Sequence, residues 1–297
     1  MAPAHHASQL FSRKVVTQEA VKASSRYQQG RDYEVLTRES GQQRDNLPIF
    51  TATPNTVVFS TREEEAGDQV KRFDCPDIPG AFHLSNVLTS DECEQILSLS
   101  EAMGYTTDAP VSLGRDIRHN ENCVWIMDES ILHPIFNRCR RLLPQEVAGG
   151  QVVGLNARCR LYKYGPQDIF RAHTDGSWPG SGVVDGQLEF DAYRDRWSQL
   201  TFLIYLNEDF EGGATTFYIP SKVQGCGEAR GVAAKQGSVL CFHHGSHPLS
   251  PLHEGSEILQ GVKYIIRTDL LYTLPGAGNA DVQGPWRRNY AGQKPDL

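Results

Sequence analysis

The sequence predicts an α+β fold in which a pair of helices packs against a β-sandwich or jelly roll. Helical periodicity occurs twice between residues 89 and 144. From residue 152 onward it gives way to short β-like runs separated by Gly, Pro, Asp and Asn. Several short strands that follow a pair of helices are typical of helices packed on a sandwich or jelly roll.

The first helix is expected to begin at Thr89 and to end at Gly104. Thr89 can cap the helix while Glu92, three residues on, reaches back to complete a capping box. Apolar residues then recur at helical spacing until the glycine. A second helix is predicted within residues 129–144, beginning near Pro134 and ending at Pro144.

The predicted strands are the β-branched and aromatic runs of the second half of the chain. The segment NEDFEGGATTF is interpreted as a hairpin turn, in which Gly212 and Gly213 supply backbone angles that other residues resist. The clearest runs are residues 157–164, 200–207, 214–219, 238–244 and 262–273.

Three regions are expected along the chain. Residues 1–70 are polar with little periodicity, which predicts a flexible N-terminal extension. Residues 71–275 contain the periodic segments and are expected to form the folded domain. Residues 276–297 are rich in Gly, Asn and Pro, which indicates a C-terminal tail.

Composition excludes several classes of function. The formal net charge of −7 argues against a nucleic-acid binder, which usually presents a basic face. No apolar run approaches the roughly 20 residues that span a bilayer. Seven cysteines without a CxxC pair favour reduced thiols in an intracellular compartment. We therefore expect a cytoplasmic protein, with a mitochondrial or plastid transit segment as the alternative, because the first residues are basic and lack a secretory apolar core.

His173 and Asp175 stand one residue apart in the segment RAHTDGSWPG. In a strand, residues i and i+2 point to the same side, so both side chains can meet one ion. Two imidazoles and one carboxylate on one face of an iron form the ligand set of non-haem Fe(II) oxygenases. Candidates for the second imidazole lie in the segment HHGSHPLSPLHEG and are His243, His244, His247 and His253.

Lys263 lies ten residues after His253, inside the apolar run VKYIIRTDLLYT. A cation in an apolar strand is costly unless an anion meets it. The strand period puts Arg267 on the same side as Lys263. A dicarboxylate that chelates a metal at one end and reaches Lys263 at the other would satisfy this charge, and one such hydrogen bond contributes about 1.5–3 kcal/mol.

The chain resembles the prolyl 4-hydroxylase-like branch of the Fe(II)/2-oxoglutarate-dependent oxygenases over residues 78–273. The resemblance is strongest from residue 160 onward, and its motifs occur in the family's order. The segments that carry it are YGPQDIFRAHTDG, LTFLIYLNEDFEGGATTF, KQGSVLCFHH and HEGSEILQGVKYIIRTDLLY.

The resemblance implies a double-stranded β-helix core, jelly-roll and cupin-like, with helices packed on one side. It implies that His173, Asp175 and His253 ligate Fe(II), since only His253 combines the HEG motif with a lysine ten residues on. It further implies that Lys263 binds the far carboxylate of 2-oxoglutarate. Two tyrosines match residues of the cosubstrate pocket: Tyr164 as a hydrogen-bond donor and Tyr205 as a lining residue.

Other residues near the motifs have two interpretations each. Arg267 is expected either to contact cosubstrate or substrate, or to form a structural ion pair. Trp178 and Trp197 flank a segment, residues 176–196, that resembles a lid over the iron, but each indole could equally be a hydrophobic plug beneath that loop.

Arg118 and Asn120 lie in the segment RDIRHNEN, where family members place a substrate-facing loop, and are candidate substrate contacts. The segment departs from the family pattern, in which an arginine follows soon after the asparagine. The resemblance therefore does not define the substrate.

The expected function is a dioxygenase that hydroxylates a prolyl, peptidyl or amino-acid-like substrate with Fe(II), 2-oxoglutarate and O2, releasing succinate and CO2. Ascorbate would keep the iron reduced. The alternatives are a small-molecule oxygenase of the same mechanism, acting on a natural product or free amino acid, and a non-catalytic metal-binding β-helix protein. No nucleic-acid partner and no membrane span are expected, and the oligomeric state stays open.

Overall fold

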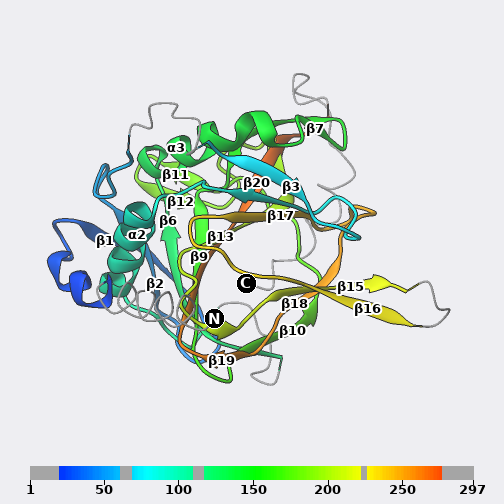
Figure 1. The fold of residues 1–297 in the computed structure, drawn as a ribbon. Helices are drawn as coiled ribbons and strands as arrows, with labels where there is room; N and C mark the ends of the chain where they lie inside the picture. Colours follow the sequence, from blue (N-terminus) through cyan, green and yellow to red (C-terminus); the bar gives the residue numbers. More distant parts are fainter. Residues whose placement is uncertain (1–19, 61–68, 110–116, 222–225, 276–297) are drawn as a thin grey trace.

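Two β-sheets face each other, and helices cover the outer side of the larger one (Figure 1). The computed structural model describes residues 20–60, 69–109, 117–221 and 226–275. Within these residues the large sheet has eleven strands. In spatial order nine of them are β1 (Tyr33–Glu39), β2 (Leu47–Ala52), β6 (Glu121–Ile126), β9 (Arg158–Tyr164), β20 (Lys263–Thr273), β13 (Arg196–Tyr205), β17 (Val239–His243), β4 (Phe82–Ser85) and β3 (Lys71–Asp74). Of the other two, β8 (Gly150–Leu155) pairs with β20, and β7 (Glu146–Val147) pairs with β8.

The small sheet has five strands. In spatial order they are β16 (Gly227–Val232), β15 (Thr215–Pro220), β18 (Leu252–Gly255), β10 (Ile169–His173) and β5 (Arg118–His119). Two short pairs accompany it, β11 (Gly182–Val184) with β12 (Gln187–Glu189) and β14 (Glu211–Gly212) with β19 (Ile258–Gln260). The helices are α2 (Ser90–Met103) and α3 (Glu129–Cys139), with 3-10 turns η1 (Ser24–Arg26) and η2 (Arg140–Leu142).

The order of the strands is that of a jelly roll. From β9 the chain crosses to β10 in the small sheet, returns to β13, crosses to the hairpin of β15 and β16, returns to β17, crosses to β18 and ends in β20. Each sheet therefore receives alternate strands of the chain. The predicted double-stranded β-helix core with helices on one side is confirmed.

Hydrophobic residues fill two layers, one on each face of the large sheet. The outer layer joins residues such as Leu99 of α2 to Ile266 of β20. The inner layer lies between the sheets and includes Phe217 and Phe242. Because both faces are covered, the first ten residues of β20 are buried, including its charged ones.

Helix α2 follows the prediction at both ends. The hydroxyl of Thr89 accepts a hydrogen bond from the Glu92 amide, and the Glu92 carboxylate accepts one from the Thr89 amide, which completes the capping box. Gly104 ends the helix at φ 94°, where a side chain would be strained. Both carboxylate oxygens of Glu92 also accept from Arg138 of α3, each at 2.8 Å, so one buried ion pair joins the two helices.

Helix α3 begins earlier than predicted. Its cap is Asp128, whose carboxylate accepts from the Ser130 amide at 2.7 Å, and Pro134 lies inside the helix. The start expected near Pro134 is therefore wrong, because the Asp128 cap stabilises an earlier start, whereas the internal proline removes a single hydrogen bond.

The expectation of a flexible extension over residues 1–70 is wrong for residues 20–60. Strands β1 and β2 pair with each other, and β2 pairs in parallel with β6, so the segment extends the large sheet. Leu47, Ile49 and Phe50 are buried there. The apolar run of β2 is only a few residues long and lies in a polar segment, so the composition of the whole segment did not indicate a strand. Residues 1–19, 61–68 and 276–297, including the expected tail, lie outside the described residues.

The glycine pair after β13 lies in a connection that crosses from the large sheet to the small sheet, so the predicted hairpin turn is wrong. Gly212 and Gly213 have φ angles of 78° and 64°, as their role in a turn predicts. However, β13 and β15 lie in different sheets, and the segment between them pairs with β19. Among the residues that the structure describes, neither helix has the length and apolar character that crossing a lipid bilayer requires.

Candidate active site

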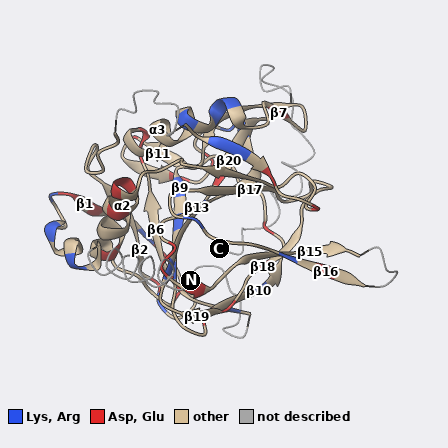
Figure 2. Ribbon diagram, in the orientation of Figure 1, with Lys and Arg blue, Asp and Glu red and all other residues tan. Residues whose placement is uncertain are grey.

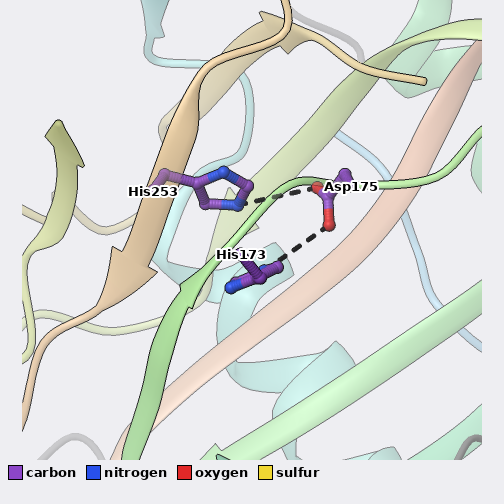
Figure 3. A group of neighbouring side chains, drawn as sticks. All are labelled: His173, Asp175 and His253. Carbon is purple, nitrogen blue, oxygen red and sulfur yellow. Dashed lines mark ion pairs between the residues drawn. The ribbon is translucent and has the colours of Figure 1, made fainter. Parts of the chain in front are cut away.

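His173, Asp175 and His253 meet at the edge of the space between the sheets (Figure 3). His173 ends β10 and lies directly opposite His253 of β18 in the strand pairing. Asp175 follows in the loop after β10 and turns its carboxylate toward both rings. Its oxygens lie 3.6 Å from Nε2 of His173 and 3.8 Å from Nε2 of His253. One ligand atom from each residue falls within 4.8 Å of the others.

Hydrogen bonds fix which ring nitrogens face the centre. Nδ1 of His173 lies 2.8 Å from the Arg171 carbonyl, and Nδ1 of His253 lies 3.1 Å from the Pro251 carbonyl. A carbonyl oxygen accepts a hydrogen bond and cannot donate one, so Nδ1 has the hydrogen in each ring and Nε2 keeps its lone pair. Burial lowers the pKa of His253, which also favours the neutral imidazole. Both rings therefore present lone pairs to one point, as metal ligation requires.

Asp175 is held as a carboxylate. Burial opposes its ionisation, but the Arg267 guanidinium holds the pKa of Asp175 well below its ordinary value. Nε of Arg267 lies 3.5 Å from the carboxylate. The Thr201 hydroxyl donates to Oδ2 at 2.6 Å.

A buried chain of hydrogen bonds continues behind Thr201. Since Thr201 gives its own proton to Asp175, its oxygen accepts from Nδ1 of His244 at 3.0 Å. Nε2 of His244 then accepts from the Ser198 hydroxyl at 2.9 Å. Burial lowers the pKa of His244, so the ring is neutral and can have one donor and one acceptor nitrogen. These hydrogen bonds, made by residues of β13 and by the residue after β17, orient the carboxylate of Asp175.

His244 lies outside the three-residue group. The same holds for the remaining candidates for the second imidazole, His243 and His247. Their rings stack on each other with centroids 3.7 Å apart. His253 is the histidine that the fold brings to His173 and Asp175.

A cavity of about 270 Å³ opens beside the three residues, between the inner face of the large sheet and the small sheet. Its walls combine aromatic and aliphatic side chains with several cations. Among its lining residues are Tyr162, Tyr164, Trp178, Phe190, Leu203, Phe242 and Ile265, with Arg118, Arg158, Arg160, Lys263 and Arg267.

Lys263 lies deep in this cavity at the start of β20. Its side chain donates to the Gly213 carbonyl at 2.6 Å and lies over the rings of Tyr164 and Tyr205. Burial lowers its pKa to about 8. Within the described part of the chain no carboxylate forms an ion pair with Lys263, so a buried cation here lacks an anion.

Tyr164 lines the cavity, whereas Tyr205, which was expected to line it, is not among the lining residues. The Tyr205 ring is fully buried, and its hydroxyl lies 2.8 Å from that of Thr215. Thr215 reaches the cavity in its place. Sequence reasoning missed both Thr215 and Thr201, because a threonine in a strand is ordinary and its role depends on which sheet it faces.

Arg267 forms the ion pairs that one of its two interpretations expects, and its contact with cosubstrate or substrate stays a prediction. It lines the cavity, and it forms ion pairs with Asp175 and, at 3.1 Å, with Asp269. Trp178 also lines the cavity beside Phe190, with ring centroids 6.0 Å apart. Its backbone is tied to Ser198 in both directions, so the indole is fixed at the cavity wall.

Arg118 reaches the cavity, but Asn120 acts behind it. The guanidinium of Arg118 lies over the rings of Tyr162 and Phe170, and its Nε donates to Asn120 Oδ1 at 2.9 Å. Asn120 is absent from the described cavity lining. Residues 115–116 of the same segment lie outside the described residues.

Comparison with known proteins agrees with this geometry. Residues 159–268 match the model of the 2OG-Fe(II) oxygenase superfamily. This segment is a 2OG-Fe(II) oxygenase domain. The match spans β9 to most of β20 and includes all three residues of the candidate centre, so the resemblance found in the sequence is confirmed.

One curated protein and two solved structures are similar to this chain. The "Putative prolyl 4-hydroxylase" of Acanthamoeba polyphaga mimivirus is 27% identical over 195 residues, which cover 62% of this chain and 71% of the relative. The viral collagen prolyl hydroxylase of Paramecium Bursaria Chlorella virus-1, solved with 2OG, is 18% identical with a TM-score of 0.42, covering 71% of this chain and 100% of that one. A Pseudomonas putida prolyl-4-hydroxylase is 14% identical with a TM-score of 0.44, covering 65% and 92%.

The oxygenase domain implies Fe(II), 2-oxoglutarate and O2 as cofactor and cosubstrates, and the residues present fit them. Two imidazole nitrogens with free lone pairs and one carboxylate converge on one point, which is the ligand set of a non-haem iron that keeps open positions. The buried Lys263 lacks an anionic partner among the described residues, which fits a cosubstrate carboxylate.

Proposed function

We propose that this oxygenase hydroxylates a prolyl, peptidyl or amino-acid-like substrate and converts 2-oxoglutarate to succinate and CO2. The observation that carries the proposal is the convergence of His173, Asp175 and His253 beside a cavity that also contains the buried Lys263. A structural metal site would be closed and would need no cavity with a buried cation.

Each residue has a role in the proposal. His173, Asp175 and His253 would hold Fe(II), and Lys263 would bind the far carboxylate of 2-oxoglutarate through a charge-assisted hydrogen bond. Burial raises the pKa of Tyr164, so its phenol stays protonated and can donate to the same carboxylate. When bound, Fe(II) supplies oxygen insertion into a C–H bond with O2 and 2-oxoglutarate, and ascorbate keeps the iron reduced.

Protein side chains orient the reactants and keep water out. Thr201 fixes the carboxylate of Asp175, while Trp178 and Phe190 form an aromatic wall of the cavity. An apolar wall excludes water from a reacting centre and strengthens the polar interactions that remain. The protein therefore contributes orientation and a dry pocket.

Two observations bear on the substrate. The mimivirus relative is named as a prolyl 4-hydroxylase, which supports a prolyl or peptidyl substrate. The cavity is small, about 270 Å³, which supports a small-molecule oxygenase of the same mechanism as the second candidate.

Succinate formation from 2-oxoglutarate by the full chain with Fe(II) and ascorbate tests the proposal. We expect slow turnover without added substrate, lost in His173→Ala and in Lys263→Ala. His247→Ala is the matched control, because this ring stacks on His243 and lies outside the metal centre. Turnover that persists in His173→Ala would contradict the proposed iron site.

A further inference from the structure

The cavity contains more positive charge than one dicarboxylate cosubstrate requires. Alternate residues of a strand face one side, so β9 and β20 each point two cations into the cavity, and β5 adds another. In Figure 2 the Lys and Arg residues are blue, and β9 has such residues. Cations from the three strands that line the cavity are Arg118, Arg158, Arg160, Lys263 and Arg267.

Two of these cations have acidic partners in the protein. Arg158 forms an ion pair with Glu39 of β1 at 2.6 Å. Arg267 forms ion pairs with Asp269 at 3.1 Å and with Asp175 at 3.5 Å. Their charges are therefore balanced without a ligand.

Arg160 has no such partner. In the described ranges no carboxylate lies within ion-pair distance of its guanidinium. The guanidinium carbon lies 5.0 Å from the centroid of the Trp178 ring. Arg160 also lies directly opposite Arg267 in the pairing of β9 with β20. Like charges at such positions destabilise a sheet. Burial lowers the pKa of Arg160 to about 10, and the nearby cations Arg267 and Arg158 act in the same direction.

The position of Arg160 separates it from the expected cosubstrate anchor. Lys263 pairs with Tyr164, and Arg267 pairs with Arg160, so the two cations belong to positions four residues apart. Along a strand this separation is about 13 Å between Cα atoms. A short dicarboxylate held by Lys263 and the metal would therefore leave Arg160 without an anionic partner.

The surroundings of Arg160 suit a small acid. Trp178 supports one face of its guanidinium, and Arg118 lies over the ring of Tyr162, two residues further along β9. A guanidinium presents parallel donors that match a carboxylate, and an aromatic neighbour holds the fork in place. Arg267 links this region to Asp175, so an acid bound here lies next to the metal centre.

We propose that Arg160 binds the carboxylate of the substrate that is oxidised, and that the substrate is a small carboxylic acid. This inference rests on the proposed function and narrows it, since an uncharged prolyl segment within a peptide would leave Arg160 without an anion. A free amino acid or a similar small acid would fit a cavity of about 270 Å³ beside the cosubstrate.

The test is calorimetric titration of the full chain, loaded anaerobically with Fe(II) and saturating 2-oxoglutarate. The probes are proline, pipecolate, benzoate and N-acetylproline, each beside its carboxamide. We expect at least one acid to bind about tenfold more tightly than its carboxamide, as a charge-assisted hydrogen bond predicts. Arg160→Met should abolish this preference while it leaves the Kd of 2-oxoglutarate within about threefold.

Lys163→Met is the matched control, because Lys163 lies on the other face of β9 and pairs with Glu101 at 3.0 Å. It should retain the preference for the acid. If no acid is preferred, or if the preference survives in Arg160→Met, the inference is overturned. If 2-oxoglutarate itself fails to bind, the proposed function fails instead, and titration of the acids alone still tests Arg160.

Discussion

Lys263 lies directly opposite Tyr164 in the pairing of β20 with β9, and its ammonium lies 5.8 Å from the centre of that ring. The pairing places a buried cation beside a buried phenol in the cavity wall, and within the described residues no carboxylate forms an ion pair with Lys263. A cation in this position is costly to fold without a ligand, and the cost is offset when an anion binds.

Replacing Lys263 with methionine should therefore weaken 2-oxoglutarate binding. Loss of one charge-assisted hydrogen bond of about 1.5–3 kcal/mol corresponds to a rise in Kd of about 10- to 150-fold. Anaerobic calorimetry with the Fe(II)-loaded protein measures it. Lys163→Met, on the opposite face of β9, should bind as the unaltered protein does, and equal weakening in both variants would speak against a specific anchor.

Binding of 2-oxoglutarate should also depend on pH above neutrality. Burial lowers the pKa of Lys263 to about 8, so the side chain is protonated below that pH and loses its charge as the pH rises through it. The Kd should be nearly constant below pH 8 and rise by up to about tenfold per pH unit above it. In Lys263→Met this dependence should disappear, and a profile unchanged by the substitution would assign the titration to another group.

Thr201→Val should weaken metal binding without removing a ligand. The hydroxyl donates to Asp175 at 2.6 Å and joins the carboxylate to His244. Loss of such a supporting hydrogen bond typically costs about 10- to 100-fold in metal affinity. Fe(II) affinity measured by competition with a chelator checks this. Thr216→Val, whose hydroxyl lies 2.8 Å from that of Ser256 on the small sheet, is the control and should keep the original affinity.

Glu92→Ala should destabilise the fold through the ion pair that joins α2 and α3. Removing one partner of a buried pair leaves Arg138 uncompensated, which costs about 3–5 kcal/mol. Burial opposes ionisation of Glu92, but Arg138 and the amides of Thr89 and Ser60 lower its pKa to about 2. The stabilisation is therefore complete above pH 4.5 and lost as the pH falls toward 2.

Urea unfolding at several pH values measures this effect. Glu94→Ala in the same helix is the control, and its free energy of unfolding should fall much less. A loss in Glu92→Ala that stayed constant down to pH 2 would contradict the assignment to an ionised carboxylate.

The parts of the site that lie close together in the sequence, or recur in a fixed motif order, were predictable. His173 and Asp175 share a strand end, and the ten-residue spacing of His253 and Lys263 is a feature of the resembled family. The strand period likewise put Arg267 on the side of Lys263, and the structure places both in the cavity.

The other contacts of the site could not be predicted, because they depend on which strands pair, and local sequence patterns do not specify the pairing. The pairing of Arg160 with Arg267 follows from the register of β9 and β20, and the contact of Thr201 with Asp175 follows from the crossing between sheets. The prediction of a hairpin at Gly212 was wrong for the same reason. A tight turn and a crossover both favour glycine at positive φ, so the glycines alone do not distinguish them.

Anaerobic binding of 2-oxoglutarate to the full chain, with and without Fe(II), tests the central claim most directly. The account predicts that one equivalent binds to the Fe(II)-loaded protein and that binding weakens sharply without the metal or in His173→Ala. Equal binding with and without Fe(II), or no binding to the loaded protein, would contradict a metal centre and cosubstrate pocket that act together.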